Sequence, residues 1–320
     1  MTAALVSAHG LTKHYRVAGR RRLTAVNDVD LEVAAGTVRA VVGESGCGKS
    51  TTGRLLLGLE TPSAGEVRFD GRGLAERSPA ELRALRRELQ VVFQDPYDVL
   101  NPRMRVDTIL REPARVHGQE GSARSVPDLL DLVNLSSDFA ERYPHELSGG
   151  QRQRIAIARA IALNPRFVVC DEPVSALDVS VQAQVVNLLR RLQDDLGLAY
   201  LFISHDLALV RYLAQDTTVM YLGRVVEEGP TEQLFADPRH PYTQLLLAAV
   251  PRVRGERSAT SREVRRLGEL PSPLDAPPGC VFATRCPLAD DRCRATRPEL
   301  RDVNGHRVAC HYAETADVAA

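Results

Sequence analysis

The chain has 320 residues, more than the ~150 of a typical domain, so we expect one large domain and an appendage. Its 41 acidic and 41 basic residues cancel, which argues against a net field that draws the chain to nucleic acid or anionic lipid. No run reaches the ~18 apolar residues of a membrane span, and no secretory signal is evident. We therefore expect a cytoplasmic protein that meets the membrane only through partners.

The first segment, residues 4–36, carries short β-like runs separated by turn signals. Tyr15 lies within it, ahead of the glycine-rich stretch described next. Its ring could stack on a nucleotide base, but a buried core tyrosine has the same appearance in a sequence. The residue types leave both interpretations of Tyr15 open.

A phosphate-binding loop of the form G-x-x-x-x-G-K-[ST] follows the apolar run 38–42. Its glycines let successive backbone N–H groups turn toward one point, and a helix beginning near Lys49 adds its positive end. Lys49 is expected to reach the β- and γ-phosphates, and the Ser50 hydroxyl to help hold Mg²⁺. The loop consists of Gly43, Glu44, Ser45, Gly46, Cys47, Gly48, Lys49, Ser50 and Thr51. The helix N-terminus is expected to lower the pKa of the Cys47 thiol and to make it reactive.

Beyond the loop, the pattern predicts a helix over 54–59, a strand over 65–69 ending in an Asp70-Gly71 turn, a helix over 79–89 and a strand over 90–93. Residues 96–165 are mostly helical and polar, and we interpret them as a helical insertion in an α/β core. Breaks in that insertion are expected at its prolines: Pro102, Pro113, Pro127 and Pro144.

The insertion closes with Leu147, Ser148, Gly149, Gly150 and Gln151 before an apolar helix. Ser148 is a good N-cap, and the paired glycines leave backbone N–H groups uncovered at the helix start. The stretch is therefore a second candidate phosphate site, although a simple helix cap would give the same pattern.

Two further apolar runs, 167–170 and 199–203, are typical of strands buried on both faces of a parallel sheet. The first ends in Asp171-Glu172 and the second is followed by His205. Carboxyl ends of parallel strands are where such sheets bind ligands. Asp171 is expected to bind Mg²⁺, and Glu172 to polarise the attacking water beside the γ-phosphate.

Over residues 4–235 these motifs resemble the nucleotide-binding subunits of ATP-binding-cassette (ABC) transporters. The most diagnostic motif is residues 147–151, which lie between the phosphate loop and the Asp171-Glu172 strand. The resemblance implies that Gln94 senses Mg²⁺ and touches membrane subunits, that Asp178 belongs to a loop crossing a dimer interface, and that His205 contacts the γ-phosphate. No catalytic position departs from the family pattern.

The resemblance also implies the fold and the mechanism. The fold is an α/β P-loop NTPase core with an antiparallel β subdomain and the helical insertion. Two such domains close head to tail, with each ATP between residues 43–51 of one and Ser148 to Gln151 of the other. Closure would move two transmembrane permease subunits, and hydrolysis would reverse the movement. The second ATPase subunit is either an identical or a different chain.

A narrower resemblance, to oligopeptide and dipeptide importers, extends past the cassette. It covers the stretch from Gln94 to Met104, the phrase His240-Pro241-Tyr242-Thr243 with residues 245–251, and a tail that includes Arg285-Cys286-Pro287. The resemblance implies an extracytoplasmic solute-binding protein as a further partner and a position on the cytoplasmic face of the membrane. Nickel and glutathione importers share these features, so the solute remains open. We expect a cassette at 1–235 and a C-terminal extension at 236–320.

Cys280, Cys286, Cys293 and Cys310 are the cysteines outside the nucleotide motifs, separated by 5, 6 and 16 residues. The surrounding proline-rich tail is expected to bury little apolar surface, so a metal centre would supply a cross-link. Some relatives are thought to hold a [4Fe-4S] cluster here; zinc and unliganded thiols are the alternatives. We expect this tail to be separate from the ATP site.

Other functions also fit parts of the sequence. A soluble ABC ATPase acting on ribosomes or DNA usually has two cassettes or a coiled-coil insertion, and this chain has one cassette and no such insertion. A regulatory protein that binds nucleotide without turnover would not need both Glu172 and His205. An exporter subunit would not need the importer-like tail.

Overall fold

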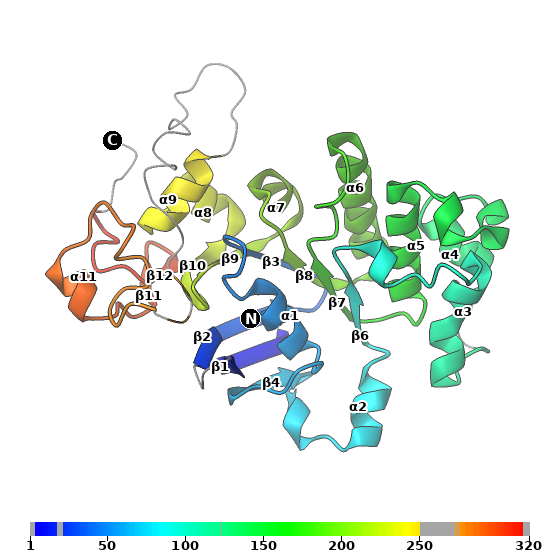
Figure 1. Cartoon of the computed structure of the whole chain (residues 1–320), viewed down its shortest axis with the longest axis horizontal. Helices are drawn as coiled ribbons and strands as arrows, with labels where there is room; N and C mark the ends of the chain where they lie inside the picture. The colour runs from blue at the N-terminus through cyan, green and yellow to red at the C-terminus, as the bar shows by residue number, and fades with distance from the viewer. Residues whose placement is uncertain are drawn as a thin grey trace.

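The computed structural model describes residues 4–17, 22–121, 123–249, 272, 274 and 276–315. Two β-sheets and the helices around them form the molecule (Figure 1). The end of the stretch 245–251 that resembles peptide importers, residues 250–251, lies outside the described residues.

The N-terminal part forms the expected antiparallel sheet, in the order β2-β1-β4-β5. In β1 and β2, buried and exposed side chains partly alternate, which is typical of a sheet with one face against a core. The strands are β1 (Ala4–Arg16), β2 (Arg22–Ala34), β4 (Ala64–Phe69) and β5 (Arg72–Gly73).

The second sheet has the order β11-β12-β10-β9-β3-β8-β7-β6, and its β9-β3-β8-β7-β6 part is parallel. Every residue of β8 is buried, with Tyr200 and Phe202 in one hydrophobic core and Leu201 and Ile203 in the other. The unbroken apolar runs therefore form strands covered on both faces, as predicted. The strands are β3 (Val38–Val42), β6 (Leu89–Val92), β7 (Phe167–Asp171), β8 (Ala199–Ile203), β9 (Asp216–Tyr221), β10 (Arg224–Pro230), β11 (Arg301–Val303) and β12 (His306–Val308).

The predicted helical insertion is present and lies to one side of the sheets (Figure 1). One predicted break is wrong, because Pro113 lies inside α3. The predicted helix over 79–89 is also shorter, ending at Leu85. The helices are α1 (Lys49–Leu56), α2 (Pro79–Leu85), α3 (Val106–His117), α4 (Val126–Leu132), α5 (Gly149–Ile161), α6 (Val179–Leu196), α7 (Leu207–Leu213), α8 (Thr231–Ala236), α9 (Pro241–Ala248) and α11 (Asp291–Ala295).

The C-terminal extension is joined to the cassette sheet. Strand β12 pairs with β10, and β11 pairs with β12, so the tail lengthens the large sheet at one edge. Phe282 is fully buried in the same core as the parallel strands. The expectation that the tail buries little apolar surface is wrong, because its irregular backbone still packs Val281, Phe282 and Ala283 into an existing core.

Within the described ranges, the chain has no helix with the length and apolar character needed to cross a bilayer.

Candidate nucleotide site

The phosphate loop connects β3 to α1, as predicted. Gly43 and Gly48 have positive φ, and a Cβ on either would lie 2.2 Å from a backbone carbonyl oxygen, so both positions require glycine. Lys49 is 4% exposed, and its ammonium donates hydrogen bonds to the carbonyls of Gly43 (2.7 Å) and Glu44 (3.1 Å). This arrangement keeps one cation at the centre of the loop.

A hydroxyl and a carboxylate meet at the predicted Mg²⁺ position. Ser50 Oγ donates to Asp171 Oδ1 over 2.8 Å, although the two residues are 121 positions apart. Burial raises the pKa of Asp171, the Ser50 hydrogen bond opposes that change, and the charge of Glu172 adds to it. Paired oxygen donors with an unfavourably buried charge suit a hard cation such as Mg²⁺.

Glu172 and His205 also come together. Strands β7 and β8 are parallel neighbours, and His205 Nδ1 lies 3.4 Å from Glu172 Oε2. Glu172 has a positive φ of 47°, which is uncommon for a residue with a side chain, and its N–H donates to the Ile203 carbonyl. The tight turn after β7 therefore holds the Glu172 carboxylate at the edge of the sheet.

Gln94 and Tyr15 lie on two other elements. Gln94 is exposed in the loop after β6, the strand next to β7. Tyr15, at the end of β1, donates its hydroxyl to Glu60 Oε2 (2.5 Å), and Lys13 Nζ lies 5.3 Å from the Tyr15 ring centre. Tyr15 is partly exposed rather than a core residue.

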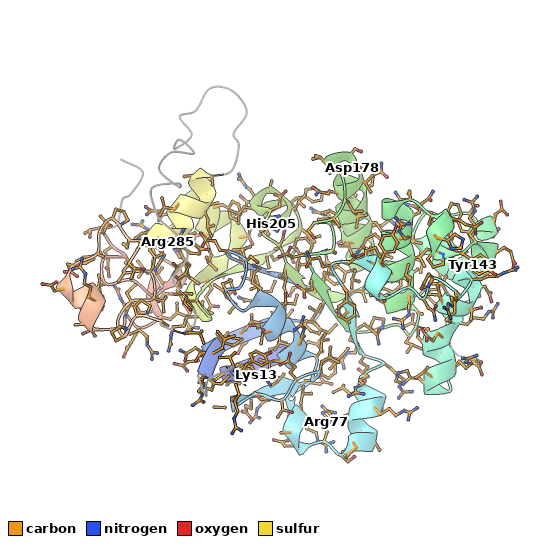
Figure 2. The ribbon with its side chains drawn as sticks, in the orientation of Figure 1. Lys13, Arg77, Tyr143, Asp178, His205 and Arg285 are labelled. Atoms are coloured by element: carbon orange, nitrogen blue, oxygen red, sulfur yellow. The ribbon has the colours of Figure 1, made fainter. Side chains whose placement is uncertain are left out.

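The second candidate anion site lies at the start of α5. This helix is on the far side of α6 from α1 (Figure 1). Ser148 Oγ accepts from the Gln151 N–H, and the Gln151 side chain accepts from the Ser148 N–H, a complete capping box. Gly150 lies so close to α6 that a Cβ would be 2.4 Å from Val181. Asp178 is the N-cap residue of α6, three positions before Val181. Figure 2 labels Asp178 and His205.

Comparisons with known proteins agree with this geometry. The family model described as "ABC transporter" matches residues 26–175, and that of "Oligopeptide/dipeptide transporter, C-terminal region" matches residues 226–293. The di/tripeptide transport ATP-binding protein DppF of Pseudomonas aeruginosa (strain UCBPP-PA14) is 47% identical over 318 residues, which cover 97% of this chain and 98% of that protein.

The chain belongs to the ATP-binding subunits of oligopeptide/dipeptide ABC transporters.

Other similarities support the same family. The dipeptide transport ATP-binding protein DppF of Escherichia coli (strain K12) is 47% identical over 314 residues, covering 96% of this chain and 93% of that protein. The dimeric, post-hydrolysis structure of the ATP-binding cassette MJ0796 bound to ADP and Pi matches with a TM-score of 0.63 at 29% identity, over 71% of this chain and 98% of that one. The chain is thus an ABC ATPase, whose hydrolysis of ATP drives transport.

This ABC ATPase has site contacts that sequence reasoning missed. Glu44 of the phosphate loop is ion-paired to Arg285, and its N–H donates to the Tyr242 hydroxyl. Arg285 and Tyr242 both lie in sequence motifs already noted for their resemblance to peptide importers. That resemblance was the only feature of the sequence that pointed to these two residues. The expectation that the tail is separate from the ATP site is wrong, because Arg285 and Tyr242 contact the phosphate loop directly.

Cys47 differs from what a helix N-terminus predicts. It is 1% exposed, and burial raises the pKa of its thiol, with smaller opposing effects from Lys49 and backbone donors. A reactive thiolate was the expectation for this position. That expectation is wrong, because the thiol packs into the core beneath the loop.

The four tail cysteines gather in one region. Burial is the main cause that raises the pKa of Cys286 to about 12, and the neighbouring Cys280, Cys310 and Cys293 contribute to the rise. In the part of the chain that the structure describes, however, no three or more His, Cys, Asp or Glu side chains are arranged to hold a metal ion. The thiols as placed do not fit a preformed iron–sulfur or zinc site.

Proposed function

We propose that this ABC ATPase energises the import of dipeptides or oligopeptides by binding MgATP at residues 43–51 and hydrolysing it with Glu172. The observation that carries the proposal is the meeting of the phosphate loop, the Ser50–Asp171 pair and the Glu172–His205 pair at one edge of the parallel sheet. Isolated strand-end acids are common, but three such groups on adjacent strands are an arrangement suited to phosphoryl transfer.

Binding of the nucleotide is assigned to the loop and to Tyr15. The backbone N–H groups of Gly46 to Thr51 would face the phosphates at the positive end of α1, with Lys49 as the cation. The partly exposed Tyr15 ring would stack on the base. Its hydroxyl contact with Glu60 supports this role by orienting the ring.

Ser50, Asp171 and Gln94 are the residues that would hold Mg²⁺. The ion supplies charge neutralisation at the phosphates when it is bound. The Ser50–Asp171 hydrogen bond supports the assignment because it sets both oxygens on one side of the loop before a cation arrives. Gln94 is exposed in the next loop, where it could respond both to the site and to a membrane subunit.

Glu172 is assigned the role of orienting and deprotonating the attacking water. Its side chain is 19% exposed, so its carboxylate is accessible from one side, and the turn at its positive φ restricts where that carboxylate can lie. His205, 63% exposed, would contact the γ-phosphate from the adjoining strand. Glu172 would thus act on the attacking water, and His205 on the γ-phosphate, in the same reaction.

A second ATP-binding subunit completes each site in this proposal. Ser148 to Gln151 would close over the ATP held by the partner's phosphate loop, with Asp178 at the dimer interface. The exposed position of Ser148 at the start of α5 supports this, as does the dimeric form of the cassette MJ0796. Two permease subunits and an extracytoplasmic solute-binding protein would complete an importer at the cytoplasmic face of the membrane, without a nucleic acid partner.

The peptide substrate and the division of the chain rest on the C-terminal region. The match to the oligopeptide/dipeptide transporter C-terminal region and the names of the related DppF proteins support peptides as the solute class. We place the boundary between cassette and extension near residue 235. Uptake assays with di- and oligopeptides in a strain lacking this chain, with nickel and glutathione as the competing solutes, test the substrate class.

Changing Glu172 to Gln tests the catalytic assignment. The amide keeps the shape of the side chain and loses the base, so we expect MgATP-dependent dimerisation to persist while ATPase activity of the assembled complex falls by about 10²–10⁴. Glu232→Gln is the matched control, because Glu232 is an exposed glutamate that pairs with Arg211 away from the site. Near-normal hydrolysis by the Glu172→Gln protein would remove Glu172 from this role.

The iron–sulfur and zinc predictions have a separate test. Protein purified without oxygen is analysed for iron, zinc and visible absorption. About four irons per chain with brown colour would establish a cluster, and about one zinc in colourless protein would establish zinc. Absence of both metals leaves the thiols as packing groups of the extension.

A further inference from the structure

An acidic residue occupies the first variable position of the phosphate loop. Glu44 follows Gly43 directly, and its carboxylate is 25% exposed. A phosphate loop binds a polyanion through N–H groups and a helix end, so a nearby carboxylate opposes the ligand. The protein therefore has to neutralise Glu44 for the loop to bind ATP well.

The C-terminal extension supplies that neutralisation. Arg285 Nη1 donates to Glu44 Oε2 over 2.8 Å and Nη2 donates to Oε1 over 3.1 Å, a two-point pair across 241 positions of the chain. The Arg285 side chain is only 7% exposed. A bidentate, largely buried guanidinium stays paired with a carboxylate much better than an exposed lysine does.

The backbone of Glu44 is held from the same direction. Its N–H donates to the Tyr242 hydroxyl over 2.9 Å, so this N–H points toward α9. The Tyr242 ring packs 4.7 Å from the Tyr221 ring and 5.4 Å from the Phe282 ring. Side chain and backbone of Glu44 are thus fixed by two residues C-terminal to the cassette.

Arg285 is itself positioned by packing. It donates to the Tyr221 hydroxyl over 3.3 Å and lies over the Tyr221 ring. Its backbone N–H donates to the Phe282 carbonyl, and Phe282 is fully buried among the aromatic rings. Figure 2 shows Arg285 beside the α8 and α9 region, where the extension meets the large sheet. The guanidinium is therefore held in place by the docked extension.

We propose that Arg285 is a positioning residue of the nucleotide site, which cancels the charge of Glu44 and fixes the start of the phosphate loop, so that ATP affinity depends on the docked C-terminal extension. This inference rests on the proposed binding of ATP at residues 43–51. It makes the extension part of the nucleotide site, in addition to any role in assembling the transporter.

A charge-compensation experiment tests the proposal. MgATP dissociation constants are measured by fluorescent-nucleotide displacement for the full-length wild type, Arg285→Gln, Glu44→Gln and the double variant. Arg285→Gln leaves an uncompensated carboxylate by the loop and is expected to weaken binding about tenfold. Glu44→Gln leaves the guanidinium and is expected to bind at least as tightly as wild type. The double variant, neutral again, is expected to return to within about threefold of wild type.

Two further variants separate charge from structure. Arg285→Lys keeps the charge without the two-point geometry and is expected to recover only part of the affinity. Arg294→Gln is the matched control within the extension, because Arg294 is 62% exposed and pairs with Asp291. In steady-state assays of the complex, Arg285→Gln is expected to raise KM with little change in kcat, since Glu172 and Asp171 are untouched.

The outcomes are distinct. If Arg285→Gln binds MgATP like wild type, or if Glu44→Gln and the double variant bind as weakly as Arg285→Gln, charge compensation is refuted. Should Arg285→Gln fail to fold, a Glu44→Gln protein that binds more weakly than wild type refutes it equally. A wild-type protein that binds no MgATP would instead refute the proposed function, independently of Arg285.

Discussion

Replacing Phe282 by alanine tests whether an aromatic cluster docks the C-terminal extension on the cassette. Phe282 is completely buried. Its ring centre lies 5.2 Å from Tyr221, 5.4 Å from Tyr242 and 5.8 Å from His240, with the Tyr221 ring at 88°. These separations are those of favourable edge-to-face and tilted pairs.

The expected cost follows from this packing. Truncation of a buried phenylalanine costs about 3–5 kcal/mol, from lost transfer free energy and the cavity that remains. A loss of that size is a large part of the 5–15 kcal/mol that separates folded from unfolded states in typical domains. Because Phe282 lies where the tail meets the sheet, we expect the extension to open locally before the cassette unfolds.

The assay combines limited proteolysis with nucleotide titration. In Phe282→Ala, cleavage within residues 276–315 is expected to accelerate while the cassette fragment persists. MgATP affinity is expected to fall, since an opened extension withdraws Arg285 from Glu44. Phe282→Leu, which fills most of the volume, is expected to cost less than about 1.5 kcal/mol. Phe139→Ala, a half-buried phenylalanine of the helical insertion, controls for the loss of a ring elsewhere.

Two results would refute this reasoning. One is a Phe282→Ala protein with wild-type protease resistance and melting temperature, which would mean that the aromatic cluster contributes little. The other is faster cleavage of the extension with unchanged MgATP affinity. That result would separate docking from nucleotide binding and leave Arg285 without its proposed effect.

Three further predictions concern other parts of the chain. Lys49→Ala is expected to abolish nucleotide binding by the isolated subunit, whereas Ser148→Arg is expected to spare nucleotide binding and to block MgATP-dependent dimerisation. An equal nucleotide-binding defect in both variants would contradict the role of Ser148 in the partner's site. Cys47 is expected to react slowly with iodoacetamide because burial raises the pKa of its thiol, and to react more slowly still when MgATP is bound. Mass spectrometry compares its labelling rate with that of an exposed reference thiol in the Ser148→Cys variant. Equal labelling rates for the two thiols would contradict the burial of Cys47. Burial lowers the pKa of His240 from 6.5 to about 4. The neutral His240 side chain therefore makes its full contribution to the free energy of unfolding above pH 6.5. As the pH falls toward 4, protonation lowers the free energy of unfolding by about 3 kcal/mol. Glu227, whose side chain accepts from the backbone N–H of His240, is the acid that opposes this shift. His240→Asn keeps an acceptor for the α9 N-terminus and is expected to flatten the pH dependence of the melting temperature in that window; an unchanged slope would contradict the assignment.

The sequence by itself determined the cassette and its chemical groups. The phosphate loop, Ser148 to Gln151 and Asp171-Glu172 are contiguous motifs, and their chemistry depends on local backbone geometry that glycines, caps and strand ends encode. The apolar runs were long enough to identify buried parallel strands, and this predicted that β3, β7 and β8 would bring their polar ends together. The predicted arrangement of these strands is confirmed, and the roles of the residues at their ends stay predictions.

Only the tertiary structure decided how the extension relates to that site. The Arg285–Glu44 pair joins positions 241 residues apart, and the β10–β12 pairing has no local signal in a tail with little periodicity. The environment of Cys47 likewise depends on which side of the loop faces the core, so its burial overrode the expectation from the helix end. A motif specifies which groups a loop carries, whereas the charge and packing around it come from segments that meet only when the chain has folded.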